Sequence, residues 1–182
     1  MDHKQQIREA KVLFASGQLE KSIESFNRAE AQGSDIIDTS LSRGAALVAL
    51  RRFEEAERDF SRVLEADTEN ERAYYFRGVA RAALGQFQAA INDLTQSIRR
   101  NNDRGVARLL RGLAYSELGQ SGEAENDLNF AAASSAHEME SFKNVFSVID
   151  SPFKNTKAKL GDENESLKNV LSDRSAQMLR NL

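Results

Sequence analysis

The 182-residue chain has no cysteine and only two histidines, and these absences exclude several kinds of chemistry. Without cysteine it has no disulfides, no thiolate metal ligands and no cysteine nucleophile. His3 and His137 lie too far apart in the sequence to form a local histidine cluster. The motifs of nucleotide-binding loops, zinc proteases and serine hydrolases are also missing. We therefore expect a protein that is not an enzyme and that holds no metal and no cofactor.

Long apolar runs, which mark membrane helices and secretory signals, are absent as well. The longest, residues 45–50, is much shorter than the roughly 20 residues that span a membrane. The charged residues at the N-terminus are not followed by the apolar stretch of a signal peptide. The chain is expected to be soluble and cytoplasmic, without contact with a membrane.

Proline and glycine are scarce, with one and ten residues, whereas strong helix formers such as Ala, Glu, Leu and Arg fill most of the chain. This composition predicts an all-α protein. The formal net charge is −3, from 25 Lys and Arg against 28 Asp and Glu. Such a balance argues against a general polyanion binder, because affinity for nucleic acid depends largely on neutralising phosphates.

A period of 34 residues runs through most of the chain. Gly44, Gly78 and Gly112 follow one another at this interval, and Ala10 lies one interval earlier. A large apolar residue recurs in the same register, at Phe26, Phe60, Leu94 and Leu128. A turn position also recurs, at Gly17, Arg51, Gly85 and Gly119. The period predicts four units, residues 3–36, 37–70, 71–104 and 105–138.

These columns resemble the tetratricopeptide repeat, a 34-residue helix–turn–helix unit with small residues at places 8 and 20 and a large apolar residue at place 24. The small residues let the two helices of a unit approach closely, and the large residue fills the space between them. The resemblance covers residues 3–138. It implies a right-handed superhelical solenoid and a protein–protein interaction scaffold that binds a peptide or helix in its concave groove.

Two charged columns vary together inside the array. Place 7 is arginine at Arg43, Arg77 and Arg111, and place 23 is aspartate at Asp59, Asp93 and Asp127. In the first unit both are replaced, by Glu9 and Ser25. We interpret the columns as ion pairs between the two helices of one unit, each contributing about 0–1 kcal/mol if exposed.

The resemblance assigns a peptide-binding groove to residues on the first helix of each unit. This predicted groove consists of ten residues: Ile7, Lys11, Phe14, Leu41, Val48, Arg72, Tyr75, Val79, Leu109 and Leu113. Most are large and apolar, which favours a ligand with apolar anchors; the alternative is that they pack between neighbouring helices. Family members that bind the acidic tails of chaperones use several polar and basic residues at fixed places of the repeat. At those places in this chain only Arg72 has a suitable charge, so a chaperone tail is not expected as a ligand.

The chain continues beyond the four units. Residues 139–149 carry an apolar stripe and are predicted to form a capping helix, followed by a linker at residues 150–163. Residues 164–182 are predicted to form an amphipathic helix with one apolar stripe: Leu167, Leu171, Met178 and Leu182. Because such a helix is only marginally stable alone, it needs a partner surface. That surface is either the groove, in its own array or in a second copy as a homodimer, or another side of the array.

A rival interpretation uses a local basic cluster, which consists of Arg99, Arg100, Arg104, Arg108 and Arg111. Such a cluster is compatible with a repeat protein associated with nucleic acid. Acidic residues interleave with the arginines along the chain, and aromatic residues that could stack on bases are few. Both features favour a solvated face over a nucleic-acid site.

Overall fold

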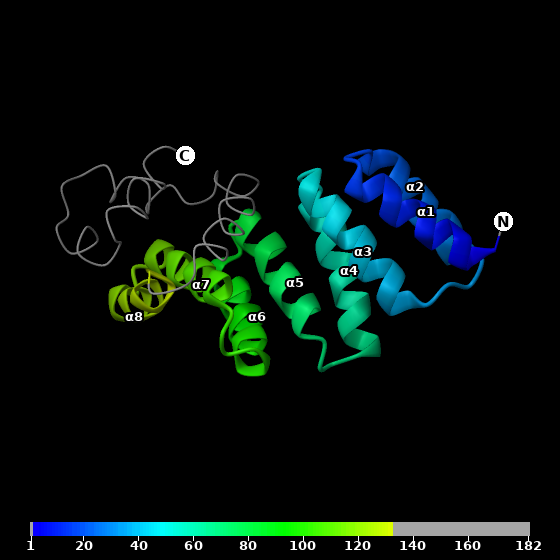
Figure 1. Ribbon diagram of the computed structural model, residues 1–182. Helices are drawn as coiled ribbons and strands as arrows, with labels where there is room; N and C mark the ends of the chain where they lie inside the picture. The colour runs from blue at the N-terminus through cyan, green and yellow to red at the C-terminus, as the bar shows by residue number, and fades with distance from the viewer. Residues whose placement is uncertain (1, 133–182) are drawn as a thin grey trace.

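The computed structural model describes residues 2–132, and these residues form eight α-helices and no strand (Figure 1). The helices follow one another in four consecutive pairs: α1 (His3–Ala15) with α2 (Leu19–Ala31), α3 (Ile36–Ala49) with α4 (Phe53–Ala66), α5 (Glu71–Ala83) with α6 (Phe87–Arg100), and α7 (Gly105–Glu117) with α8 (Ser121–Ala132). The prediction of an all-α helical solenoid is confirmed.

The turn inside each pair has the same backbone geometry. Its central residue has a positive φ at Gly17 (76°), Arg51 (60°), Gly85 (73°) and Gly119 (75°). The backbone N–H of the next residue donates to the carbonyl oxygen of the residue five positions before it. In the first pair, Gln18 N lies 2.9 Å from Leu13 O. This is the Schellman ending of a helix, which glycine adopts without steric cost. Arg51 is the one non-glycine residue in this column, so its side chain is strained by the positive φ.

The small and large columns meet inside each pair, as predicted. Phe26, Phe60 and Leu94 are completely buried. A Cβ atom placed on Gly44 would lie 2.6 Å from the ring of Phe60, so α3 and α4 approach more closely than any larger residue would allow.

The pairs stack so that one helix of each forms an inner layer. Besides its own pair, α3 contacts α1 and α5, and α5 contacts α7. Closer spacing of these helices curves the array toward the side of α1, α3, α5 and α7, which we call the inner face. The largest apolar cluster extends through α3–α8 and takes Ile23 from α2. The first pair has a separate small cluster: Ile7, Ala10, Phe26 and Ala29.

The remaining predictions about the chain's organisation fall outside the described residues. These are the end of the fourth unit, the capping helix at 139–149, the linker at 150–163 and the C-terminal helix at 164–182.

Candidate functional site

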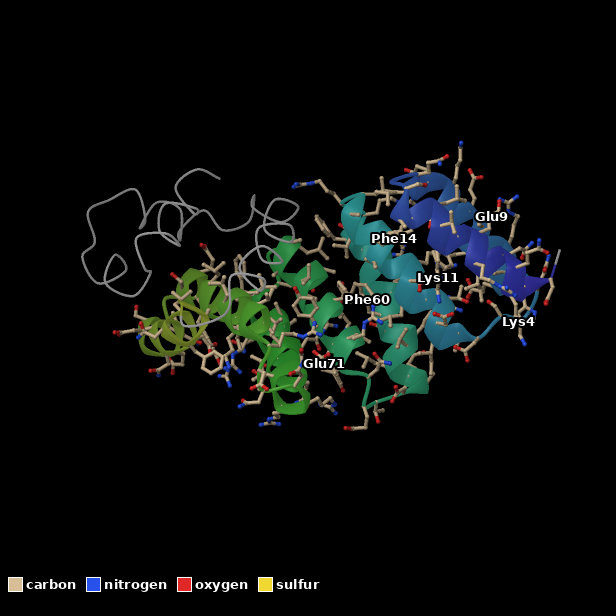
Figure 2. The ribbon with its side chains drawn as sticks, in the orientation of Figure 1. Lys4, Glu9, Lys11, Phe14, Phe60 and Glu71 are labelled. Carbon is tan, nitrogen blue, oxygen red and sulfur yellow. The ribbon has the colours of Figure 1, made fainter. Side chains whose placement is uncertain are left out.

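The structure separates the ten residues of the predicted groove into two groups. Lys11, Phe14 and Arg72 are exposed, and Leu41 is half-buried. Figure 2 shows Lys11 and Phe14 along α1. The other six are at most 9% exposed and belong to the apolar clusters: Ile7, Val48, Tyr75, Val79, Leu109 and Leu113. These six side chains therefore pack between neighbouring helices and support the inner face from beneath.

Charge on the inner face is partly compensated. Lys11 Nζ lies 2.7 Å and 2.9 Å from the two carboxylate oxygens of Asp38, which links α1 to α3. Arg72 makes no ion pair with any residue between 2 and 132. The inner face thus combines one uncompensated guanidinium with the apolar side chains of Phe14 and Leu41.

The predicted Arg–Asp pairs are present in three helix pairs and have the same two-bond geometry. Arg43 donates to Asp59 at 2.8 Å and 2.6 Å, Arg77 to Asp93 at 2.8 Å twice, and Arg111 to Asp127 at 2.6 Å and 2.8 Å. Asp59, Asp93 and Asp127 are all at most 4% exposed. The range for exposed ion pairs therefore does not apply, and burial makes each of these pairs energetically more important than a surface ion pair.

Each of these arginines also bonds to the preceding helix pair, a contact that sequence analysis missed. The free Nη1 of Arg43 donates to Asn27 at 2.8 Å, that of Arg77 to Ser61 at 3.1 Å, and that of Arg111 to Thr95 at 3.0 Å. The three acceptors follow one another at the same 34-residue interval, a signal that was available in the sequence. One guanidinium therefore joins three helices and fixes how successive pairs stack.

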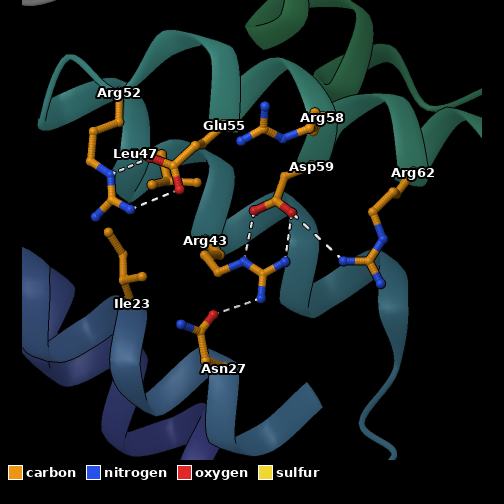
Figure 3. Close-up of a pocket in the computed structure, with 9 residues that line it drawn as sticks. All are labelled: Ile23, Asn27, Arg43, Leu47, Arg52, Glu55, Arg58, Asp59 and Arg62. Carbon is orange, nitrogen blue, oxygen red and sulfur yellow. Dashed lines mark hydrogen bonds and ion pairs between the residues drawn. The ribbon is translucent and has the colours of Figure 1, made fainter. Parts of the chain in front are cut away.

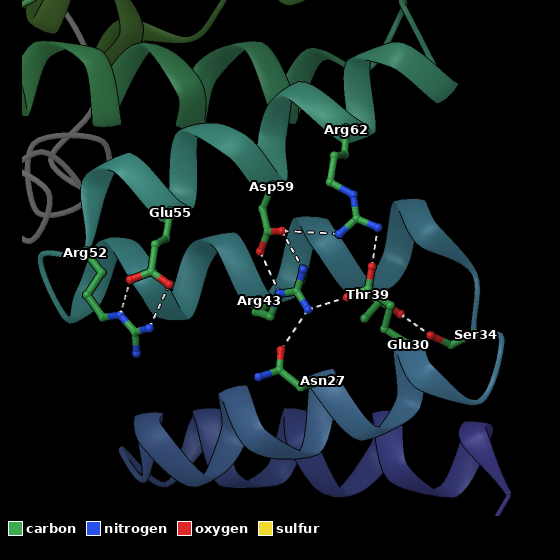
Figure 4. A network of polar contacts seen from close by, with 9 residues as sticks. All are labelled: Asn27, Glu30, Ser34, Thr39, Arg43, Arg52, Glu55, Asp59 and Arg62. Carbon is green, nitrogen blue, oxygen red and sulfur yellow. Dashed lines mark hydrogen bonds and ion pairs between the residues drawn. The ribbon is translucent and has the colours of Figure 1, made fainter.

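The first of these networks also includes two further charged residues, Glu30 and Arg62 (Figure 4). Arg43 Nη1 also lies 2.5 Å from Glu30, whose second oxygen accepts from Arg62. The hydrogen bond from Arg62 holds the pKa of the Glu30 carboxyl below its ordinary value. Hydrogen bonds to Asp59 raise the pKa of Arg43, so this guanidinium stays charged despite its burial. The first two helix pairs are thus joined mainly by charged and polar groups.

A pocket of about 330 Å³ lies beside this network, between α2, α3 and α4 (Figure 3). Its apolar floor is formed by Ile23 and Leu47, which are 6% and 3% exposed. Four arginines and two carboxylates surround the floor: Arg43, Arg52, Arg58, Arg62, Glu55 and Asp59. Arg52 is bound to Glu55 at 2.6 Å and 2.7 Å, so most of the positive charge at this pocket is already neutralised within the chain.

The basic cluster of the rival interpretation is compensated in the same way. Four of its five arginines have acidic partners: Arg100 with Glu69, Arg104 with Glu71, and both Arg108 and Arg111 with Asp127. Arg104 also lies over the ring of Tyr75, with its Cζ 4.5 Å from the centroid. Guanidiniums that are held by carboxylates and aromatic rings are poorly placed to release counterions from a phosphate backbone. Arg99 is the exposed member without such a partner in the described part of the chain.

None of the helices within residues 2–132 has the length and apolar character that crossing a bilayer requires.

Comparisons with known proteins agree with this architecture. A family model described as tetratricopeptide repeat matches residues 41–105. One crystal structure of MamA superposes with a TM-score of 0.70 at 18% identity, covering 98% of this chain and 92% of that one. YrrB, described as a TPR protein with an unusual peptide-binding site, superposes with a TM-score of 0.67 at 18% identity over 97% and 91% of the two chains.

A further MamA structure, from AMB-1, has a TM-score of 0.66 at 21% identity and covers 72% of this chain and 77% of that one. No curated protein sequence matches the chain significantly. Likeness at this level of identity shows the shared solenoid fold, and the family match adds the repeat type. The match over residues 41–105, together with these superpositions, supports a tetratricopeptide repeat protein.

Proposed function

We propose that this protein is a non-enzymatic scaffold that binds a peptide or helix of a partner protein along the inner face. The observation that carries the proposal is the mixed surface of that face. Phe14 on α1 is 38% exposed and Leu41 on α3 is half-buried, so both offer apolar contact area, and Arg72 on α5 adds an uncompensated charge. The six buried residues of the predicted groove form the floor beneath these contacts. A ligand that fits has apolar anchors and one acidic group.

The proposal is tested by comparing what the wild-type chain and its variants retain from a lysate. Phe14→Ala and Arg72→Glu are expected to lose the specific partner, because each removes one of the exposed contacts. Val12→Ala is the matched control, since Val12 is 68% exposed and lies on the same helix as Phe14 but is not part of the predicted groove. A partner that all four proteins retain equally would contradict binding on the inner face.

A finer part of the proposal concerns residues 164–182, whose sequence predicts an amphipathic helix with one apolar stripe. We propose that this segment is itself a ligand of the inner face, in its own array or in a second copy. Truncation after Pro152 is then expected to change a dimer into a monomer, as measured by light scattering, or to strengthen binding of a competing apolar peptide. Unchanged mass and unchanged peptide affinity would mean that the segment packs elsewhere.

A further inference from the structure

A second groove is lined by residues of α6, of α7 and of the start of α8. Of these helices, α6 packs against α7, and α7 packs against α8 (Figure 1). The groove has a volume of about 700 Å³. Its lining on α6 extends along almost the whole helix: Gln88, Ile91, Asn92, Thr95, Gln96 and Arg99. The opposite wall consists of Tyr115, Gln120 and Glu123. From residue 88 to residue 99 the groove is about 16 Å long, which is the length of roughly five extended residues. We call it the amide groove.

Three side-chain amides form the outer row of this groove: Gln88, Asn92 and Gln96. The same three register places carry charges in the earlier repeats, with Glu54, Arg58 and Arg62 on α4 and Glu20, Glu24 and Arg28 on α2. A water-exposed helix stripe is ordinarily charged, as it is on α2 and α4. On α6 amides replace the charges at all three places, whereas the pocket at the equivalent place between α2, α3 and α4 is surrounded by charged side chains.

Side-chain amides are suited to the backbone of another chain. Each offers a donor and an acceptor, as a peptide group does. Residues four apart on a helix are about 6 Å apart along its axis, close to the roughly 6.7 Å between alternate residues of an extended chain. Arg100 Nη1 donates to Gln96 Oε1 at 2.9 Å, which orients that amide and leaves its nitrogen available as a donor. Gln88 Nε2 donates to Asn92 Oδ1 in a long hydrogen bond of 3.5 Å, which leaves the Gln88 oxygen and the Asn92 nitrogen available. The spacing of the row matches every second peptide group of an extended segment.

The floor of the amide groove is apolar and fits an apolar side chain of a bound peptide. Ile91 is 4% exposed and lies next to the half-buried ring of Tyr115. In the preceding helix pair, Arg81 stands at the place of Tyr115 and bonds to Glu57 at 2.8 Å and Asp93 at 2.9 Å. In that pair the Arg81 side chain therefore occupies the place that corresponds to the floor of the amide groove. At the amide groove one arginine and one glutamate, Arg99 and Glu123, leave no net charge in the lining.

We infer that the amide groove is a second binding site, which takes about five residues of an extended, uncharged peptide segment of a partner protein. The backbone of that segment bonds to Gln88, Asn92 and Gln96. One valine- or isoleucine-sized side chain of the segment rests on Ile91 and Tyr115. This site lies on other helices than the exposed inner-face residues Lys11, Phe14 and Leu41, so the inference does not depend on the proposed function.

The test uses a fluorescein-labelled, acetylated peptide of alternating threonine and valine, with anisotropy measured against the full chain. Asn92→Ala is expected to weaken binding about three- to tenfold, the effect of one lost hydrogen bond. The matched control is Asn129→Ala, because Asn129 is an exposed amide on α8 outside the groove lining. The same peptide N-methylated at alternate amides is expected to lose binding, since its backbone can no longer donate.

Three results would overturn the inference. One is the absence of binding up to about 1 mM peptide. Another is that the N-methylated peptide binds as tightly as the unmodified one, which would show that the peptide backbone does not donate hydrogen bonds to the groove. The third is loss of binding in Phe14→Ala with no change in Asn92→Ala, which would place the peptide on the inner face. That last outcome would support the proposed function and reject the amide groove, so the two proposals fail separately.

Discussion

The pair between Arg77 and Asp93 offers the sharpest test of how the array is held together. Replacing each residue with alanine, alone and together, gives a double-mutant cycle. The Arg77 side chain is 17% exposed and that of Asp93 is 4% exposed, and two hydrogen bonds of 2.8 Å join them. Arg81 also donates to Asp93, at 2.9 Å.

The expected magnitudes follow from what each change leaves behind. Asp93→Ala leaves two guanidiniums without their buried carboxylate, which costs about 3–5 kcal/mol of unfolding free energy. Arg77→Ala is expected to cost less, about 1.5–3 kcal/mol, because Arg81 still compensates Asp93. The coupling energy of the cycle is expected at about 1–3 kcal/mol, above the range of exposed pairs.

Urea unfolding followed by circular dichroism at the helical minimum measures all four proteins. The control is the cycle on Lys11 and Asp38, whose side chains are 49% and 46% exposed and whose coupling is expected at about 0.2–1 kcal/mol. Raising the salt concentration should reduce the control coupling and leave the Arg77–Asp93 coupling nearly unchanged. Equal small couplings in both cycles would refute the view that burial strengthens the Arg–Asp column.

Four further changes test other parts of the fold. Arg51→Gly should raise the unfolding free energy by about 1 kcal/mol, because it relieves a positive φ in a non-glycine residue; an unchanged urea midpoint would refute this. Gly44→Ala should lower thermal stability by about 1–3 kcal/mol through overpacking against Phe60, whereas Gly122→Ala, which meets no atom within 4 Å, should not. Because the pKa of Glu30 is lowered on folding, its contribution to stability is present above the ordinary value of 4.5 and is lost as the pH falls. Urea titrations at several pH values should therefore show that acid lowers the unfolding free energy of Glu30→Gln less steeply than that of the wild type. Amide hydrogen exchange should be at least about tenfold faster in α1 and α2 than in α5 and α7, because Ile23 alone links the first pair to the main apolar cluster; equal protection would show that the polar interface holds the first pair equally well.

Much of this fold could be predicted because its strongest contacts repeat every 34 residues. The contact of Gly44 with Phe60 and the bond from Arg77 to Asp93 each join residues 16 apart within one helix pair. Such contacts depend on one helix length and one turn, and both are encoded locally by helix-forming residues and by the glycine at the turn. The turn was predicted even at Arg51, where the sequence lacks the glycine.

Contacts between helix pairs could not be predicted in the same way. Sequence analysis placed Val79 and Leu113 on the predicted groove, whereas the structure buries both completely, and Phe14, in an equivalent helix of the first pair, is 38% exposed. The amide groove likewise depends on how α6 packs against the following helix pair.

The sequence by itself therefore determined the helices, their pairing and the ion pairs inside three of the four helix pairs. Tertiary structure alone decided which apolar residues are buried between units, which arginines join three helices and where grooves remain open. The physical reason is that stacking depends on the rotation between successive pairs. That rotation is set by many side chains acting together across the interface, and no single column of the repeat records it.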